Sequence, residues 1–374
     1  MFNLLLDHPE PDFAALELVL KGEQEPRRVH LVELGFDEEV LQVINERYLS
    51  RPWIPLPPWF GSTESLQPAC FENLVAIYHS LGHDFVPIWP VWPEHPTPRR
   101  RFTEDTAQLN RGQRAWVEVN SGHIASWEDF ERFPWDKIRG DPAPAKFVAK
   151  NLPSGMKMTV TSTLFEHVGE NLVGYARLFY MLHDEPELVA RIFDSWGQKV
   201  YDFYESVVGM DELGAIFHAD DLGYRTSTMV SPHILRQLVF PWLRRFSELA
   251  HQHGKMFWLH SCGNLYQSGV IEDLIRDVQI DALHSFQDTI LPVTDFKTRY
   301  GDRVAALGGL DVDKLSRLDE ASLRRYIRDV VERCTPGGRF ALGSGNTVTN
   351  YIPVESYSIV VEEARRWQPP HRPV

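Results

Sequence analysis

Short apolar segments alternate along the chain with longer segments in which apolar residues recur every three or four positions. The short segments are typical of buried β-strands, and the longer ones are typical of helices that cover a sheet. Eight segments have the strand pattern: 28–34, 84–89, 158–163, 215–219, 256–260, 282–286, 304–307 and 340–342. Because eight alternating strands and helices close into a cylinder, the pattern predicts an α/β fold of the (β/α)8 TIM-barrel type.

The helices between these strands are predicted from periodicity and from their start and stop signals. Residues 187–207 carry apolar side chains at three- or four-residue steps, as does the segment 323–330. Another helix is predicted to begin at Pro232 and to end at Gly254. Pro241 lies inside that helix and predicts a kink, because proline cannot donate the backbone hydrogen bond.

Residues 90–151 interrupt the alternation. The segment opens with several prolines, continues with three consecutive arginines at 99–101 and contains repeated aromatic clusters. Long excursions in barrels follow the carboxyl ends of strands, at the catalytic face. We therefore expect one barrel domain over residues 1–374, with 90–151 as an insertion or lid after the second strand.

Composition and charge exclude several functional classes. With 38 Lys and Arg against 52 Asp and Glu, the net charge is −14, which argues against nucleic acid or an anionic membrane as partner. Three cysteines are too few for a disulfide framework, and Cys70 and Cys334 lie in apolar helical patterns typical of a core. The first residues lack the features of a signal peptide, and no apolar run approaches the ~18 residues of a spanning helix. We therefore expect a cytoplasmic protein.

The residues at the carboxyl ends of the predicted strands are unusually polar. Chemistry in a TIM barrel comes from these ends, where the loops meet. The polar residues there are Glu33, Glu166, His218, Asp220, Asp221, His260, Cys262, His284, Gln287, Asp311, Ser344 and Asn346. This concentration of acids and imidazoles indicates an enzyme.

His260 and Cys262 form the sharpest local signal. Side chains at i and i+2 of a strand point the same way, so both can face one point in the barrel mouth. An imidazole and a thiolate suit zinc, and a catalytic zinc takes three protein ligands. The candidates for the third ligand are Asp220, His218, His284 and Glu33. The alternative is a hydrogen-bonded core histidine beside a small buried cysteine.

Asp220 and Asp221 form a second candidate site, in which a carboxylate could carry a proton. Adjacent strand residues face opposite sides, so only one of the two carboxylates can point into the barrel, and His218 shares the side of Asp220. An inward carboxylate near other acids, or in an apolar mouth, has a raised pKa and can carry a proton. The alternative is a solvated loop or a helix cap.

Several motifs together resemble a known superfamily. They are His218-Ala-Asp-Asp-Leu-Gly223, the Ser231-Pro232 helix with Pro241, Leu259-His260-Ser-Cys-Gly263, Gly308-Gly-Leu-Asp311 and Gly337-Gly-Arg-Phe-Ala-Leu-Gly343. They resemble the uroporphyrinogen decarboxylase superfamily, which also contains zinc-dependent methyltransferases that work with corrinoid proteins. The resemblance covers residues 155–367 well and the first 150 loosely. It implies an eight-stranded barrel, a mouth at the strand ends and a homodimer.

The chain departs from the superfamily pattern in two places. The decarboxylase has an N-terminal arginine-rich motif for the porphyrinogen carboxylates, and nothing before Arg99 matches it. The methyltransferases have a His-x-Cys pair, matched by His260 and Cys262, and a further Cys just after the last strand. Residues 343–346 read Gly-Ser-Gly-Asn instead, so a zinc site here needs an oxygen or imidazole ligand.

The resemblance implies a methyltransferase that moves a methyl group between a small methylated compound and a corrinoid protein. Zinc at His260 and Cys262 would be the Lewis acid, and Asp220 or Glu166 would orient or protonate the leaving group. The expected substrate-binding residues are Glu33, His218, Asp221, His284, Gln287, Ser344 and Asn346. A metal-independent decarboxylase or lyase is the alternative, in which Asp220 or Asp311 stabilises a cation or protonates a carbanion. A binding barrel that has lost its chemistry is a third hypothesis.

Overall fold

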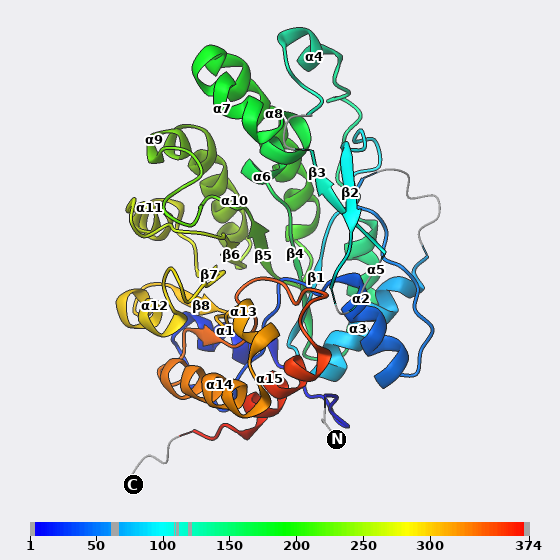
Figure 1. The fold of residues 1–374 in the computed structure, drawn as a ribbon, viewed down its shortest axis with the longest axis vertical. Coiled ribbons are helices and arrows are strands. Elements are labelled where there is room, and N and C mark those ends of the chain that lie inside the picture. Colours follow the sequence, from blue (N-terminus) through cyan, green and yellow to red (C-terminus); the bar gives the residue numbers. More distant parts are fainter. Residues whose placement is uncertain (1–3, 61–66, 108, 110–111, 119–121, 370–374) are drawn as a thin grey trace.

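The computed structural model describes residues 4–60, 67–107, 109, 112–118 and 122–369. Seven strands form one parallel sheet in the order β1-β4-β5-β6-β7-β8-β9, and the sheet curls round on itself (Figure 1). Its strands are β1 (Phe85–Ile88), β4 (Lys157–Val160), β5 (Leu213–Ala219), β6 (Met256–His260), β7 (Ala282–His284), β8 (Ala305–Leu307) and β9 (Phe340–Ala341). Each overlaps a strand predicted from the sequence.

The remaining predicted strand, 28–34, is irregular. It pairs with the last strand through a single bridge between Leu31 and Leu342, supported by a hydrogen bond of 2.9 Å from Val32 N to Leu342 O. On its other side, His30 Nδ1 lies 2.6 Å from Asp84 Oδ2, just before β1. The α/β fold is therefore confirmed as a curled parallel sheet of seven strands, with residues 28–34 lying between its first and last members.

The interior of the curled sheet is filled by alternate side chains of the strands. Ala215, Phe217 and Ala219 of β5 and Met256 and Trp258 of β6 belong to one buried apolar cluster. Alternate residues of a strand face the same side, so these positions define which residues point inward. Helix α1 (Phe13–Lys21) contributes Phe13, Leu16 and Leu20 to the same cluster.

Helices cover the outer face of the sheet, and the predicted ones are present. They are α8 (Pro186–Val208) and α14 (Glu320–Cys334), together with a composite of α9 (Pro232–Ile234), a π-helical turn η3 (Leu235–Val239) and α10 (Phe240–Gln252). The π turn ends just before Pro241, which has no N–H to donate and therefore disturbs the regular helix there. Cys334 and Cys70 are buried, as expected for core residues.

The described part of the chain contains further helices. They are α2 (Glu38–Val43), η1 (Ile44–Tyr48), α3 (Ala69–Leu81), α5 (Ala143–Asn151), α6 (Phe165–His167), η2 (Val168–Leu172), α7 (Tyr175–Asp184), α11 (Val270–Asp273), η4 (Leu274–Val278), α12 (Val293–Tyr300), α13 (Val312–Arg317) and α15 (Val354–Arg366). None of the helices in the described part of the chain is long and apolar enough to cross a membrane.

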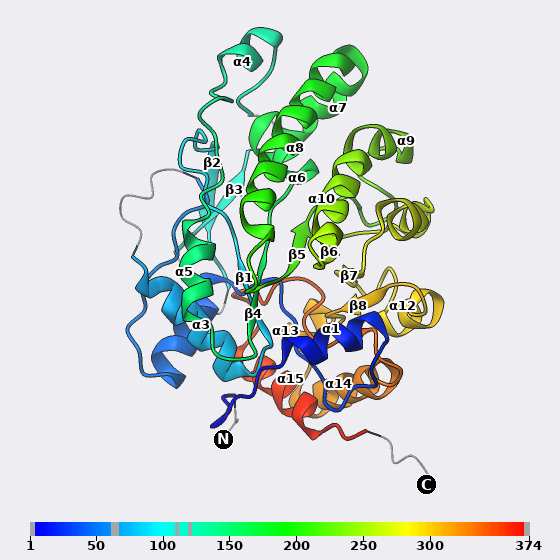
Figure 2. The same ribbon diagram turned by 180° about the vertical axis from the view of Figure 1, so that it is seen from behind.

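The segment 90–151 contains two kinds of structure. An antiparallel hairpin of β2 (Arg100–Glu104) and β3 (Gln113–Val117), followed by α4 (Trp127–Arg132), stands apart from the main sheet. The final helix α5 instead packs against α3 and β4, as Figure 2 shows from behind. The last nine residues of the predicted insertion therefore form a crossover helix of the main fold.

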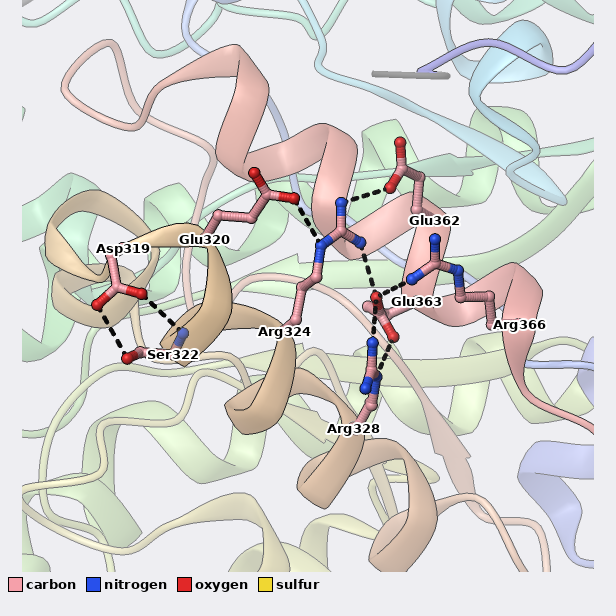
Figure 3. A network of polar contacts seen from close by, with 8 residues as sticks. All are labelled: Asp319, Glu320, Ser322, Arg324, Arg328, Glu362, Glu363 and Arg366. Atoms are coloured by element: carbon pink, nitrogen blue, oxygen red, sulfur yellow. Dashed lines mark hydrogen bonds and ion pairs between the residues drawn. The ribbon is translucent and has the colours of Figure 1, made fainter. Parts of the chain in front are cut away.

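An ion-pair network joins α14 to α15 at the end of the molecule opposite the hairpin (Figures 1 and 3). The carboxylate of Glu363, 1 % exposed, pairs with Arg324 at 2.7 Å, Arg328 at 2.6 Å and Arg366 at 2.7 Å. Arg324 also pairs with Glu362 at 2.7 Å. A buried carboxylate is stable only when it is paired and hydrogen-bonded, and this one is surrounded by guanidinium groups.

Candidate functional site

The alternation of β5 decides which of the two neighbouring aspartates enters the site. Residues 215, 217 and 219 face inward, so Asp221 continues the inward series, while His218 and Asp220 face the helices. His218 Nδ1 accordingly lies 2.9 Å from the hydroxyl of Tyr204 in α8. His218 and Asp220 do share one side, as the sequence predicted, but it is the side away from the barrel interior.

Asp220 has a defined place behind the site. Its carboxylate is fully buried and accepts backbone hydrogen bonds from Leu164, Phe165 and Glu166 at 3.3, 2.9 and 2.8 Å. These are free amides at the start of α6, where an acidic cap is favourable. Asp220 therefore fixes the turn that carries Glu166.

Asp221, His260 and Cys262 converge at the carboxyl ends of β5 and β6. His260 Nε2 lies 3.5 Å from Cys262 Sγ and 3.5 Å from Asp221 Oδ1. One ligand atom from each of the three lies within 4.8 Å of the others. His260 and Cys262 thus face one point, as expected, but the third donor beside them is Asp221, which lay outside the four expected candidates.

Two glycines allow the loops that carry these residues to touch. Gly223 N donates a 3.1 Å hydrogen bond to Cys262 O, and a Cβ on Gly263 would lie 2.3 Å from Gly223 C. Gly263 also has φ +87°, a conformation that favours glycine. The close approach lets Cys262 N donate a 3.1 Å hydrogen bond to Asp221 Oδ1. This hydrogen bond holds the Asp221 carboxylate beside Cys262.

A histidine relay fixes the proton of His260. His284 Nε2 lies 3.2 Å from the carbonyl oxygen of Ser344, which can only accept, so Nε2 carries the proton. Burial and the neighbouring His260 keep the pKa of His284 well below its usual value, so the ring is neutral and its Nδ1 accepts. His260 Nδ1, 2.7 Å away, must then donate. In the neutral ring, this tautomer leaves the lone pair of His260 Nε2 facing Cys262 and Asp221.

The donor set of this trio fits a zinc ion. His260 offers a nitrogen, Cys262 a sulfur and Asp221 an oxygen atom to one point. The sulfur accepts hydrogen bonds from Ser285 Oγ at 3.3 Å and from Asn346 Nδ2 at 3.2 Å. Burial and the Asp221 carboxylate raise the pKa of the Cys262 thiol, and a bound cation reverses both effects. Three such protein ligands and an open position are the pattern of a catalytic zinc site.

Glu166 lines a cavity and lies close enough to Asp221 of the trio to be affected by its charge. Burial raises the pKa of Glu166 well above its usual value, and the nearby Asp221 and Glu170 carboxylates raise it further. Burial also raises the pKa of Glu170, against the lowering effect of Arg100 in the hairpin. The aromatic wall of the cavity consists of Trp59, Phe60, Trp89, Trp92 and Trp196. Glu170 was not among the residues predicted from the sequence, although its four-residue spacing from Glu166 places both on one helix face.

The remaining predicted site residues are not members of the trio. Glu33 is fully buried and accepts hydrogen bonds from Ser344 N at 2.8 Å and Ser344 Oγ at 2.5 Å. Burial raises its pKa to about 8, so it holds a proton at neutral pH. Asp311 caps α13 and accepts from Asp313 N at 2.9 Å, and its other oxygen accepts from Asp288 N. Gln287 is exposed in the loop after β7.

Comparison with known proteins places the chain in a family. Its structure is similar to that of a methyltransferase from Methanosarcina mazei, with 16% identity, a TM-score of 0.64 and coverage of 95% of this chain and 98% of that chain. It also aligns with a protein described as a vitamin-B12-independent methionine synthase from Listeria monocytogenes, with 13% identity, a TM-score of 0.44 and coverage of 91% and 97%. No curated protein matches the chain. The family model for uroporphyrinogen decarboxylase matches residues 155–367, more than half of the sequence. The chain therefore belongs to the uroporphyrinogen decarboxylase family.

Proposed function

We propose that this protein is a methyltransferase that moves a methyl group from a small methylated compound to a corrinoid protein. The observation that carries the proposal is the convergence of lone pairs from Asp221, His260 and Cys262 at the strand ends. A zinc ion held there would be a Lewis acid for the heteroatom that bears the methyl group, which makes that heteroatom a better leaving group. Membership of a family of enzymes supports a catalytic function.

The chain's own residues supply the other parts of this reaction. Burial and the neighbouring carboxylates raise the pKa of Glu166, which favours its protonated form, so Glu166 can donate a proton to the departing heteroatom. Asp220 holds the Glu166 backbone in place through the 2.8 Å hydrogen bond. The tryptophans of the adjoining cavity bind the apolar part of the substrate and exclude water from the reacting atoms.

Exposed side chains on the loops that follow the carboxyl ends of the strands favour binding of a protein partner. Large aromatic side chains are exposed on the β2–β3 hairpin, on α7 and in the loop after β5, at Phe102, Trp116, Phe179, Tyr180 and Tyr224. These elements follow the carboxyl ends of the strands, and Figure 1 shows the hairpin and α7 at one end of the molecule. Aromatic side chains are enriched at surfaces that bind other proteins, so their exposure on these elements supports a protein partner.

The alternative function, a metal-independent decarboxylase or lyase, depends on different groups. It assigns the central role to Asp220 or Asp311. The carboxylates of both accept backbone hydrogen bonds at the starts of helices, Asp220 at α6 and Asp311 at α13. Such carboxylates are less available to a substrate than Asp221, whose side chain is 39% exposed. This alternative predicts an activity that is insensitive to chelators.

Zinc stoichiometry tests the proposal first. We expect about one zinc per chain by elemental analysis, and its loss in Asp221→Asn, His260→Ala and Cys262→Ala. Cys334→Ala, which removes a buried thiol at the end of α14, is the matched control and should keep its zinc. Absence of zinc after reconstitution would overturn the metal-based function and favour the lyase. Zinc binding without transfer from any class of methyl donor to a corrinoid protein would favour a binding barrel.

A further inference from the structure

Cys262 receives two hydrogen bonds whose directions the structure fixes. Asn346 Oδ1 accepts a 2.8 Å hydrogen bond from Thr347 N, so the other end of the amide, Nδ2, is the one that faces Cys262 Sγ. A carboxamide nitrogen can only donate, and the sulfur therefore accepts. Ser285 Oγ is the second donor, at 3.3 Å.

Ser285 occupies its position at a conformational cost. Its φ is +91°, a left-handed value that residues with a side chain rarely adopt, and it is 7% exposed. Strain of this kind persists where the surrounding structure holds the residue in place, and it collects at functional sites. The neighbouring Phe286 N donates a 3.1 Å hydrogen bond to Gly345 O, which ties this strained turn to the loop that carries Asn346.

We propose that Ser285 and Asn346 are positioning residues that hold Cys262 as a hydrogen-bonded thiolate and so make the metal centre a strong Lewis acid. The inference rests on the proposed function, because it requires a metal at the trio. Hydrogen bonds withdraw electron density from a thiolate, and partners outside the ligand set tune a metal in this way. With one thiolate, one carboxylate and one neutral imidazole, a divalent ion in the site carries no net charge.

The charge of the centre selects the class of substrate. A centre with few thiolates accepts a lone pair readily, whereas additional thiolates make it electron-rich and suit it to activating thiols. The structure therefore favours methyl donors that bind through a neutral oxygen or nitrogen atom. Asn346 stands beside the sulfur at a position where a cysteine would add a second thiolate.

Cobalt substitution tests these roles without an activity assay. In the Co²⁺ form, the hydrogen bonds lower the energy of the sulfur lone pair and raise the energy of the sulfur-to-cobalt charge-transfer band. We expect Ser285→Gly and Asn346→Ala each to shift that band to longer wavelength. Glycine adopts φ +91° freely, so Ser285→Gly removes the hydroxyl without adding strain. Thr347→Ala is the control and should leave the band unchanged, because Thr347 holds Asn346 through its backbone.

A gain-of-thiolate variant tests the link to the substrate class. Asn346→Cys should roughly double the charge-transfer absorbance, and the Co²⁺ centre should bind imidazole, a neutral nitrogen donor, several-fold more weakly. Unchanged bands in Ser285→Gly and Asn346→Ala would overturn the inference while leaving the metal site intact. Unchanged imidazole binding in an Asn346→Cys variant with doubled absorbance would overturn the argument on substrate class. Failure of the natural sequence to bind Co²⁺ or Zn²⁺ would instead overturn the proposed function.

Discussion

His260 and His284 face each other through their Nδ1 atoms at 2.7 Å, and His284 accepts the proton that His260 donates. The direction follows from the Ser344 carbonyl on the far side of His284. Histidine ligands of metals are commonly oriented by such a partner, which fixes the tautomer and the ring plane. His284 thus prepares His260 Nε2 as a ligand without touching the metal position itself.

Replacement of His284 should therefore weaken metal binding. In His284→Leu, His260 Nδ1 has no acceptor and its tautomer is no longer fixed, so we expect zinc affinity to fall by about 10- to 100-fold. Competition with a chromophoric chelator measures the change. His218→Leu is the matched control, because His218 is equally buried and bonds to Tyr204 instead of the trio. Equal loss of affinity in the two variants would contradict the relay.

The close contact of Gly263 with Gly223 predicts a second effect on the site. In Gly263→Ala the new Cβ would lie 2.3 Å from Gly223 C, so the Cys262 loop must move away from Asp221. We expect loss of zinc and a decrease of about 3 kcal/mol in the free energy of unfolding, from strain and displacement together.

Gly254→Ala separates strain from displacement. Gly254 has φ +68° and open space around its Cβ position, so only the left-handed strain of about 1 kcal/mol applies. The variant should retain its zinc. Chemical denaturation and elemental analysis of both variants measure the two effects, and a Gly263→Ala protein with full zinc would refute the argument from loop contact.

The fold was largely predictable because its signals are local. Strand and helix periodicities depend on burial of one face, and β1 and β4 to β9 each overlap a predicted strand. The segment 28–34 was predicted as a strand but is irregular, with a single bridge at Leu31, and its polar side chains bond to other elements, as His30 does to Asp84. The division of 90–151 into a hairpin and a crossover helix depends on contacts with α3 and β4, which no local pattern reveals.

The site was predictable in part, for a geometric reason. The i, i+2 spacing of His260 and Cys262 fixes their common side whatever the exact start of the strand. The choice between Asp220 and Asp221 depends on the absolute alternation of β5, set by packing of Phe217 against the barrel interior. The donors Ser285 and Asn346 belong to loops that meet only in the folded chain, although Asn346 was among the expected substrate-binding residues.

Glu33 predicts an unusual dependence of stability on pH. Its pKa is about 8 in the folded protein against an ordinary value of 4.5, because burial disfavours the charged form. The folded state therefore holds a proton that the unfolded state releases between these values. The free energy of unfolding should fall as pH rises from 4.5 to 8, by at most about 1.4 kcal/mol per pH unit from this group.

Glu33→Gln tests that dependence. The amide keeps an oxygen to accept from Ser344 N and has no proton to lose, so the variant should show a flatter profile and greater stability at pH 8. Urea denaturation at pH 5, 6.5 and 8 gives the comparison. A profile for Glu33→Gln that runs parallel to that of the natural sequence would show that Glu33 ionises normally in the fold.

The ion-pair network of Figure 3 predicts that Glu363, unlike Glu33, makes the fold less stable as the pH falls. Burial raises the pKa of this carboxyl, but the hydrogen bonds of Arg328 and Arg324 outweigh burial and hold the pKa below its usual value. The network therefore stabilises the fold at neutral pH, and this contribution is lost as acid protonates Glu363. In Glu363→Gln the charge is absent at every pH, so the stability difference from the natural sequence should shrink as pH falls.

The size of the Glu363 effect follows from the exposure of its partners. Removal of one member of a buried pair costs 3–5 kcal/mol in general, but Arg328 and Arg366 are 51% and 57% exposed, so solvent weakens their share. We expect Glu363→Gln to lower the free energy of unfolding by about 2 kcal/mol at pH 7. Glu320→Gln, which removes a 55% exposed partner of Arg324, should cost less than about 0.5 kcal/mol. Equal costs would mean that the burial of Glu363 adds nothing to its ion pairs.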